Sequence, residues 1–226
     1  MSKYQVRIPI ERQQFVEGRL DIPDAYGSGE RTAVVMAHGA GNDMYEPLLQ
    51  HLADGLCRSG FLALRFNFPY RTEGRKRPDS QRILESSWRE TVGWLKSQEE
   101  FPVDRLVVGG KSMGARVVSQ LAGAGRLEAD RFAFWGYPLH PPGRKSQLRD
   151  GHLDPIRKPM LFVAGTRDPF CDMALIKDVV ARLGSRAVLE VIEDGDHSFR
   201  LPKTSDKNQQ DVYEHILART MAWLQR

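Results

Sequence analysis

The chain has 226 residues, of which 41% are hydrophobic and 27% are charged. These values are typical of one globular domain over residues 1–226, and they exclude a disordered chain, a collagen and a small disulfide-stapled domain. The 33 basic and 29 acidic residues give a net charge of +4, too small for a dedicated nucleic-acid-binding protein. Cys57 and Cys171 lack the spacing of a zinc site or a redox dithiol, so we expect no metal and no other cofactor.

The apolar segments of the chain are too short for a signal peptide or a membrane span, and this predicts the cellular location of the protein. The amino terminus has no apolar run of signal-peptide length, and no later stretch reaches the length of a membrane span. The small number of cysteines fits a reducing compartment. We therefore expect a soluble, cytoplasmic protein without a membrane partner.

Apolar residues alternate in the first part of the chain and then follow a repeating pattern of strands and helices. Partial alternation over 5–10 and 14–22 predicts an antiparallel pair of strands. The run 33–37 is apolar throughout, as a strand buried on both faces requires. Further strands are expected at 61–66, 105–109, 132–135, 159–164 and 187–192, and helices around 48–56, 84–95, 117–122, 175–183 and 213–224.

This alternation of strands and helices predicts the fold class. It requires right-handed crossovers onto a mainly parallel sheet, with helices on both faces, which is a doubly wound α/β domain. Residues 138–158 show no clear periodicity and are too few to form a separate lid domain, so we expect an open site lined by loops. In such sheets, functional residues collect beyond the carboxyl ends of the strands.

The strongest motif follows the strand expected at 105–109. Residues 110–114 read Gly-Lys-Ser-Met-Gly, a G-x-S-x-G pattern between a strand and a helix, which predicts that Ser112 is a nucleophile on a sharp turn. An ordinary tight turn with an incidental serine is the simpler alternative. A phosphate-binding loop would need glycine at position 105, which is arginine, so that alternative fails.

A serine nucleophile needs a base and an acid that orients the base, in the chain order Ser, acid, His. Asp168 follows the strand at 159–164, and His197 follows the strand at 187–192, so both fall where this order requires them. Asp172 is the reserve acid, although it also resembles the N-cap of the next helix. The histidines at 51, 140, 152 and 215 lie in helices or in the irregular segment, and we expect structural roles for them.

The backbone near Ser112 supplies candidate donors for an oxyanion hole. The N–H of Met113 begins the helix after the serine, where the partial positive charge of the helix favours an anion. The second donor comes from the loop His-Gly-Ala-Gly at 38–41, either from Ala40 or from Gly41. This loop lacks the third glycine of a dinucleotide-binding turn.

Together these motifs resemble the α/β-hydrolase superfamily over nearly the whole chain. The segments 38–41, 110–114, 165–168 and 195–199 resemble its small, lidless dienelactone-hydrolase-like branch. More narrowly, 65–70 and 109–116 resemble the family of a testis-expressed hydrolase-like protein and a subunit of a nuclear acetyltransferase complex. The resemblance implies the hydrolase fold and a Ser-His-Asp triad. Dienelactone hydrolases proper use cysteine where this chain has Ser112, so esterase chemistry is the safer implication.

The resulting hypothesis is a serine hydrolase that cleaves a small-molecule ester or thioester, with peptide hydrolysis open to the same residues. The alternative is a non-catalytic interaction module that retains the scaffold. Neither the natural substrate nor the oligomeric state is indicated. The basic run 71–77 either steers an anionic substrate or is a solvated loop. Candidate substrate contacts are Gly41, Tyr70, Arg71 and Lys111.

Overall fold

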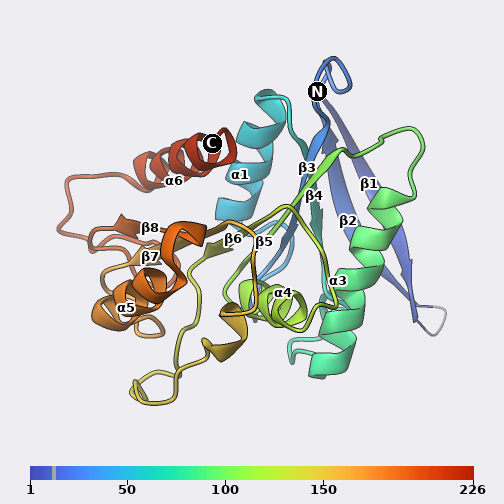
Figure 1. Cartoon of the computed structure of the whole chain (residues 1–226). Coiled ribbons are helices and arrows are strands. Elements are labelled where there is room, and N and C mark those ends of the chain that lie inside the picture. The colour runs from blue at the N-terminus through green and yellow to red at the C-terminus, as the bar shows by residue number, and fades with distance from the viewer. Residues whose placement is uncertain (12–13) are drawn as a thin grey trace.

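A computed structural model describes residues 1–11 and 14–226 and contains one eight-stranded sheet between two layers of helices (Figure 1). The strand order across the sheet is β1-β2-β4-β3-β5-β6-β7-β8. The strands are β1 (Ser2–Ile10), β2 (Gln14–Ile22), β3 (Thr32–Ala37), β4 (Leu62–Phe66), β5 (Arg105–Lys111), β6 (Arg131–Trp135), β7 (Met160–Gly165) and β8 (Ala187–Ile192).

The helices cover both faces of the sheet. The first and last of the long helices pack on one face, and the three long helices between them pack on the other (Figure 1). The α-helices are α1 (Pro47–Arg58), α2 (Pro69–Thr72), α3 (Gln81–Lys96), α4 (Met113–Gly123), α5 (Met173–Leu183) and α6 (Gln209–Leu224), with short 3-10 turns η2 (Gly151–Leu153) and η3 (Gly184–Arg186).

The pairing of the strands confirms the doubly wound α/β fold. β1 pairs antiparallel with β2, and β2 pairs antiparallel with β4. The remaining neighbours in the sheet, in the order β4-β3-β5-β6-β7-β8, all pair in parallel. Along β3, Val35 contributes to the core on one face of the sheet and Val34 and Met36 to the core on the other. This burial of both faces explains why the run 33–37 is apolar throughout.

The segment without clear periodicity, 138–158, contains the 3-10 turn η2 and packs against α4. A Cβ at Gly123 would lie 2.0 Å from the carbonyl oxygen of His152, so the segment reaches its close contact with α4 only because Gly123 has no side chain. His152 is hydrogen-bonded to Ser119 in the middle of α4, and Pro138 and Arg149 of the segment line the cleft that also contains Ser112.

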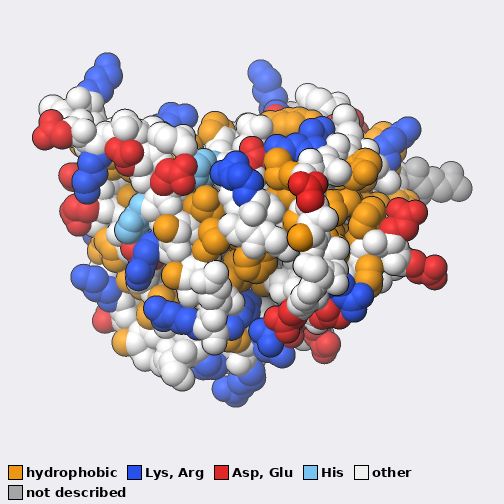
Figure 2. Space-filling view, turned by 90° about the horizontal axis from the view of Figure 1, so that it is seen from above, with side chains coloured by type: hydrophobic (Ala, Val, Ile, Leu, Met, Phe, Trp, Pro, Cys, Tyr) orange, Lys and Arg blue, Asp and Glu red, His pale blue; other side chains and the backbone are white. Residues whose placement is uncertain are grey.

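The surface of the molecule carries charges of both signs. Seen from above, Lys and Arg side chains are interspersed with Asp and Glu side chains around hydrophobic areas (Figure 2). None of the helices in the described ranges is long and apolar enough to cross a membrane.

Candidate active site

Ser112 lies on the sharp turn between β5 and α4. Its backbone has φ 52° and ψ −110°, and a non-glycine residue held in such a conformation costs about 1–3 kcal/mol. A Cβ at Gly110 would lie 2.5 Å from the backbone nitrogen of Ala115, and a Cβ at Gly114 would lie 2.5 Å from the carbonyl oxygen of Ala37. Both flanking positions therefore require glycine if the helix is to follow the strand so closely.

The loops after β7 and β8 bring Asp168 and His197 to Ser112. The Nε2 atom of His197 lies 2.8 Å from Oγ of Ser112, and its Nδ1 atom lies 2.7 Å from Oδ2 of Asp168. Because an ionised carboxylate only accepts hydrogen bonds, Nδ1 carries the proton and Nε2 accepts from the serine hydroxyl. The three residues singled out from their order in the sequence thus form one hydrogen-bonded series.

The Asp168 carboxylate is buried and fixed by a second hydrogen bond. Its side chain is 0% exposed, and Oδ1 accepts from the backbone N–H of Phe170 at 2.8 Å. A Cβ at Gly165 would lie 2.2 Å from the carbonyl oxygen of Gly195, so the loop after β8 approaches β7 this closely only because residue 165 has no side chain. The Phe170 ring lies against the imidazole of His197, with ring centroids 4.5 Å apart. These contacts hold the imidazole in one orientation.

Asp172, the reserve acid of the sequence analysis, has other partners. Its Oδ1 accepts from the backbone N–H groups of Ala174 and Leu175 at 2.9 and 3.2 Å, so it is the N-cap of α5. An ion pair with Lys145 and these N–H groups hold the pKa of Asp172 below its usual value. The geometry therefore pairs His197 with Asp168 rather than with Asp172.

The loop after β3 lies directly against the serine. A Cβ at Gly39 would lie 3.2 Å from Cβ of Ser112, so a side chain there would crowd the serine. His38 connects this loop to the segment after β4. Its Nδ1 lies 2.8 Å from the Gly39 carbonyl oxygen, and its Nε2 accepts from the Phe68 N–H at 3.1 Å. Burial lowers the pKa of His38 to about 4. His38 is therefore neutral at pH 7 and shapes the loop.

The two candidate donors of this loop occupy the centre of a turn. The N–H of Asn42 donates to the Gly39 carbonyl at 3.3 Å, and Gly41 has φ +79°. A type II turn needs this positive φ at its third residue, which explains the glycine. Ala40 lines the same cleft as Ser112 and Met113. The structure therefore brings together the serine and two of the three candidate oxyanion residues.

The four candidate substrate contacts of the sequence analysis lie outside the lining of this cleft, and their role stays a prediction. The described residues that line the cleft include none of Gly41, Tyr70, Arg71 and Lys111. Tyr70 is 0% exposed and Lys111 is 2% exposed, so neither side chain offers a surface to a substrate. Arg71 is paired with Asp43 at 3.3 Å. These side chains support the loops around the site.

The cleft beside Ser112 has a volume of about 450 Å³ and contains two arginines that the sequence analysis did not select. Arg116 lies one helical turn after the serine, and Arg149 comes from the segment before η2. The sequence contained an indication for Arg116. A cation in the first turn of a helix is disfavoured by the helix dipole, so an arginine at that position indicates a role other than helix stability. Arg149 had no such signal, because its segment lacks periodicity.

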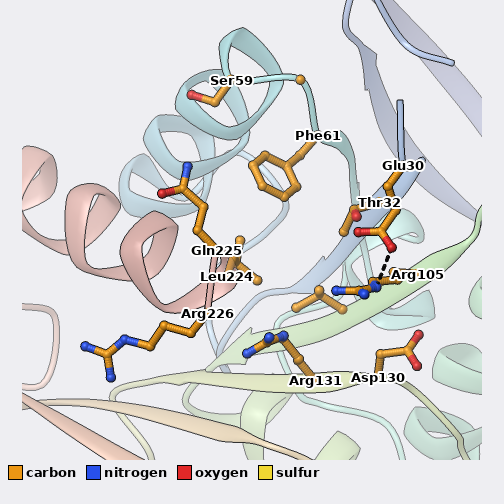
Figure 3. Close-up of a pocket in the computed structure, with 12 residues that line it drawn as sticks. Glu30, Thr32, Ser59, Phe61, Arg105, Asp130, Arg131, Leu224, Gln225 and Arg226 are labelled. Carbon is orange, nitrogen blue, oxygen red and sulfur yellow. Dashed lines mark ion pairs between the residues drawn. The ribbon is translucent and has the colours of Figure 1, made fainter. Parts of the chain in front are cut away.

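A second cavity, of about 310 Å³, lies where β3 and β5 begin. It is lined by Thr32, by Leu224 at the end of α6, and by Arg105, whose guanidinium forms an ion pair with Glu30 at 2.7 Å (Figure 3). Ligands of open α/β sheets bind beyond the carboxyl ends of the strands, which is the opposite edge. None of the described residues that line this cavity belongs to the predicted site, so we do not assign the chemistry to it.

Lys111 is a buried cation that supports the loop carrying His197. Its Nζ donates to the backbone carbonyl of His197, which ties β5 to the loop after β8. Burial lowers the pKa of Lys111 to about 8, and the charges of Glu46, Asp168 and Asp196 oppose this decrease. The amine still donates a hydrogen bond when it is neutral, so the contact with His197 survives deprotonation.

This pKa predicts how stability depends on pH. Between about pH 8 and the ordinary lysine value of 10.5, the unfolded chain binds more protons at Lys111 than the folded chain does. The free energy of unfolding of the wild type should therefore rise with pH in that window, by at most about 1.4 kcal/mol per pH unit, relative to Lys111→Met. Urea titrations at several pH values measure the difference. Lys177→Met, at an exposed position of α5, is the control whose curve should stay parallel to that of the wild type. Parallel curves for Lys111→Met would contradict the prediction.

Comparisons with known proteins agree with this fold. A family model described as an alpha/beta hydrolase domain matches residues 30–225. The fold is similar to that of a dienelactone hydrolase from Anabaena variabilis, with a TM-score of 0.78, 19% identity, and coverage of 99% of this chain and 97% of that chain. It is also similar to a serine hydrolase without a lid from Xanthomonas campestris, with a TM-score of 0.74, 19% identity, and coverage of 99% and 95%.

Among curated sequences, the chain is similar to a putative phosphoribosyl transferase of Mycobacterium tuberculosis, with 26% identity over 194 residues. The match covers 85% of this chain but 41% of the relative, so the chain spans about two fifths of the length of that protein. The name of that relative describes the longer protein. The family model, in contrast, matches most of this chain. The chain therefore belongs to the alpha/beta hydrolase domain family.

Proposed function

We propose that this protein is a serine hydrolase that cleaves a carboxylic ester or thioester of a small molecule. The observation that supports the proposal is the hydrogen-bonded series from Asp168 through His197 to Ser112, with distances of 2.7 and 2.8 Å. A serine hydroxyl is a weak nucleophile unless a neighbouring base takes its proton, and the base needs a partner that fixes its tautomer. In this proposal, Ser112 is the nucleophile, His197 the base and Asp168 the orienting acid.

In the first step, Oγ of Ser112 attacks the carbonyl carbon while Nε2 of His197 takes the hydroxyl proton. The carbonyl oxygen becomes an anion, and the backbone N–H groups of Met113 and Ala40 donate to it, with Gly41 as the alternative second donor. One such donor is typically worth about a hundred- to a thousandfold in turnover. The bond to the alcohol or thiol then breaks, His197 returns the proton to that leaving group, and the acyl group remains on Ser112.

In the second step, water replaces the leaving group. His197 takes a proton from the water as its oxygen attacks the acyl carbon, and the same N–H groups stabilise the second anion. The acid is released when His197 returns the proton to Oγ of Ser112. Asp168 stays ionised throughout and stabilises the imidazolium that forms twice in the cycle. The cycle consumes one water molecule and needs no resident cofactor.

Within the family, we place the chain in the lidless branch that resembles dienelactone hydrolases, with serine in place of their cysteine. The narrower relation to the testis-expressed hydrolase-like protein and the acetyltransferase-complex subunit rests on segments 65–70 and 109–116. We also propose that residues 1–226 act as one domain in the cytoplasm. The single sheet supports one domain, and the two buried free cysteines fit a reducing compartment.

A fluorophosphonate probe tests the proposed nucleophile. We expect covalent labelling of the wild type and none of Ser112→Ala, because the probe reacts only with a serine whose proton a base can take. Heat-denatured wild type is the control for nonspecific reaction, and circular dichroism verifies that both proteins are folded. If folded wild type remains unlabelled, the scaffold serves as an interaction module instead.

A further inference from the structure

Two arginines, Arg116 and Arg149, line the cleft beside Ser112, and we call them the cleft arginines. Arg116 follows Ser112 by four residues, so its side chain lies over the turn that carries the serine. Arg149 reaches the cleft from the segment before η2. Both side chains are half-buried. A molecule held at Ser112 in a cleft of about 450 Å³ therefore lies near two cations.

The protein does not neutralise these two charges with its own carboxylates. Asp79 also lines the cleft, but its carboxylate accepts from Arg75 at 2.6 Å and from the backbone N–H of Tyr70 at 2.8 Å. Asp150, adjacent to one cleft arginine in the chain, pairs with Arg182 at 2.8 Å. Within residues 1–11 and 14–226, neither cleft arginine forms an ion pair with a carboxylate. The nearby acids are thus committed to other partners.

The two charges act on each other. Burial lowers the pKa of Arg116, and the positive charge of Arg149 lowers it further, while Tyr137 opposes the decrease. Arg116 also lies in the first turn of α4, where the helix dipole disfavours a cation. Both effects oppose a positive charge at this position. An anion bound between the two guanidinium groups would offset this repulsion.

Arg149 is held in place by a buried network. Its backbone N–H donates to the Leu139 carbonyl at 2.8 Å, and its carbonyl accepts from the Tyr137 hydroxyl at 2.8 Å. Nε2 of His152 lies 3.0 Å from that hydroxyl and 2.9 Å from Oγ of Ser119 on α4. The network ties the segment that carries Arg149 to the helix that carries Arg116. The backbone positions of the cleft arginines are therefore fixed before a ligand arrives, which lowers the entropic cost of binding.

We propose that the cleft arginines bind an oxyanion group of the substrate, a carboxylate or a phosphate, and that esters carrying such a group are preferred. This inference rests on the proposed ester hydrolysis at Ser112. Guanidinium groups present their donors in a fixed fork that fits both kinds of oxyanion. In the basic run 71–77, by contrast, Arg71 and Arg75 are paired with carboxylates of the protein.

The test compares p-nitrophenyl esters of one chain length that differ in charge. One is the adipic acid monoester, one its uncharged methyl ester, and one carries a phosphonate in place of the free carboxylate. We expect the wild type to have a kcat/KM about 10 to 100 times higher for an anionic ester than for the uncharged one, as charge-assisted hydrogen bonds imply. The anion with the larger ratio, carboxylate or phosphonate, identifies the group that the site binds.

Substitutions assign this preference to the cleft arginines. The ratio should fall about tenfold in Arg116→Gln or Arg149→Gln, disappear in the double variant, and be partly retained in Arg116→Lys, which keeps the charge without the fork. Arg58→Gln removes the same charge at an exposed position at the end of α1 and should keep the ratio of the wild type. Thermal unfolding of each variant verifies that it is folded.

The outcomes separate this inference from the proposed function. If the wild type hydrolyses the uncharged ester as efficiently as both anionic esters, or if the ratio survives in the double variant, the oxyanion site is wrong although the hydrolase remains. If no ester is hydrolysed and no probe labels Ser112, the hydrolase is wrong. Calorimetric titration of wild type with adipate and with inorganic phosphate then decides the anion site alone. Binding that the double variant loses supports it, and absence of binding at millimolar ligand overturns it.

Discussion

Ser112→Ala and His197→Ala are each expected to abolish ester hydrolysis, by about a millionfold in turnover where the uncatalysed background permits the measurement. The double variant should be scarcely slower than either single variant. In the proposed mechanism, the hydrogen bond of 2.8 Å between Oγ and Nε2 joins the two side chains into one functional unit, because the nucleophile without its base is as inert as the base without its nucleophile. Steady-state release of p-nitrophenol measures the losses.

The stability of these variants separates catalysis from folding. Ser112 and His197 are partly exposed and Ser112 keeps its strained backbone after substitution, so we expect melting temperatures close to that of the wild type. His215→Ala is the matched control, because His215 is an exposed histidine of α6 paired with Glu190 at 2.8 Å. It should leave turnover unchanged. Losses that add in the double variant would show that the two residues do not share one step.

Much of the fold was predictable because each strand and helix leaves a local pattern. β3 is buried on both faces, and such a strand has no place for a polar residue between Ala33 and Ala37. The turn at Ser112 was predictable for a related reason. Cβ atoms at Gly110 and Gly114 would collide with backbone atoms 2.5 Å away, so the close strand-to-helix turn appears in the sequence as a pair of glycines.

The surroundings of the serine were less predictable because they depend on contacts between distant segments. Lys111 is the last residue of β5 and precedes the serine, yet only the fold shows that its amine turns to the carbonyl of His197, 86 residues away. The position of Arg149 depends on Tyr137, directly before the irregular segment 138–158, and on His152 within that segment. Sequence patterns report which residues are buried in regular elements, whereas these side chains are placed by loops that meet only after the sheet has formed.

The two aspartates of the loop after β7 lie only four positions apart in the chain, yet their environments differ. Asp168 is buried, accepts from Nδ1 of His197 at 2.7 Å and from the backbone N–H of Phe170 at 2.8 Å. Asp172 caps α5 and pairs with Lys145, away from the imidazole. An amide at either position is nearly the same size as the carboxylate, so substitution by asparagine changes charge and hydrogen bonding with little change in packing.

Asp168→Asn should lower turnover about ten-thousandfold, because an amide N–H facing Nδ1 favours the tautomer that presents a proton, instead of a lone pair, to the serine. Asp172→Asn should have a small effect on turnover, because asparagine is also a good N-cap. Ester hydrolysis by the two variants, measured beside their melting temperatures, compares the roles of the two carboxylates directly. A crippled Asp172→Asn beside an active Asp168→Asn would move the orienting role to Asp172 and would require the loop after β7 to rearrange during turnover, while Ser112 and His197 kept their roles.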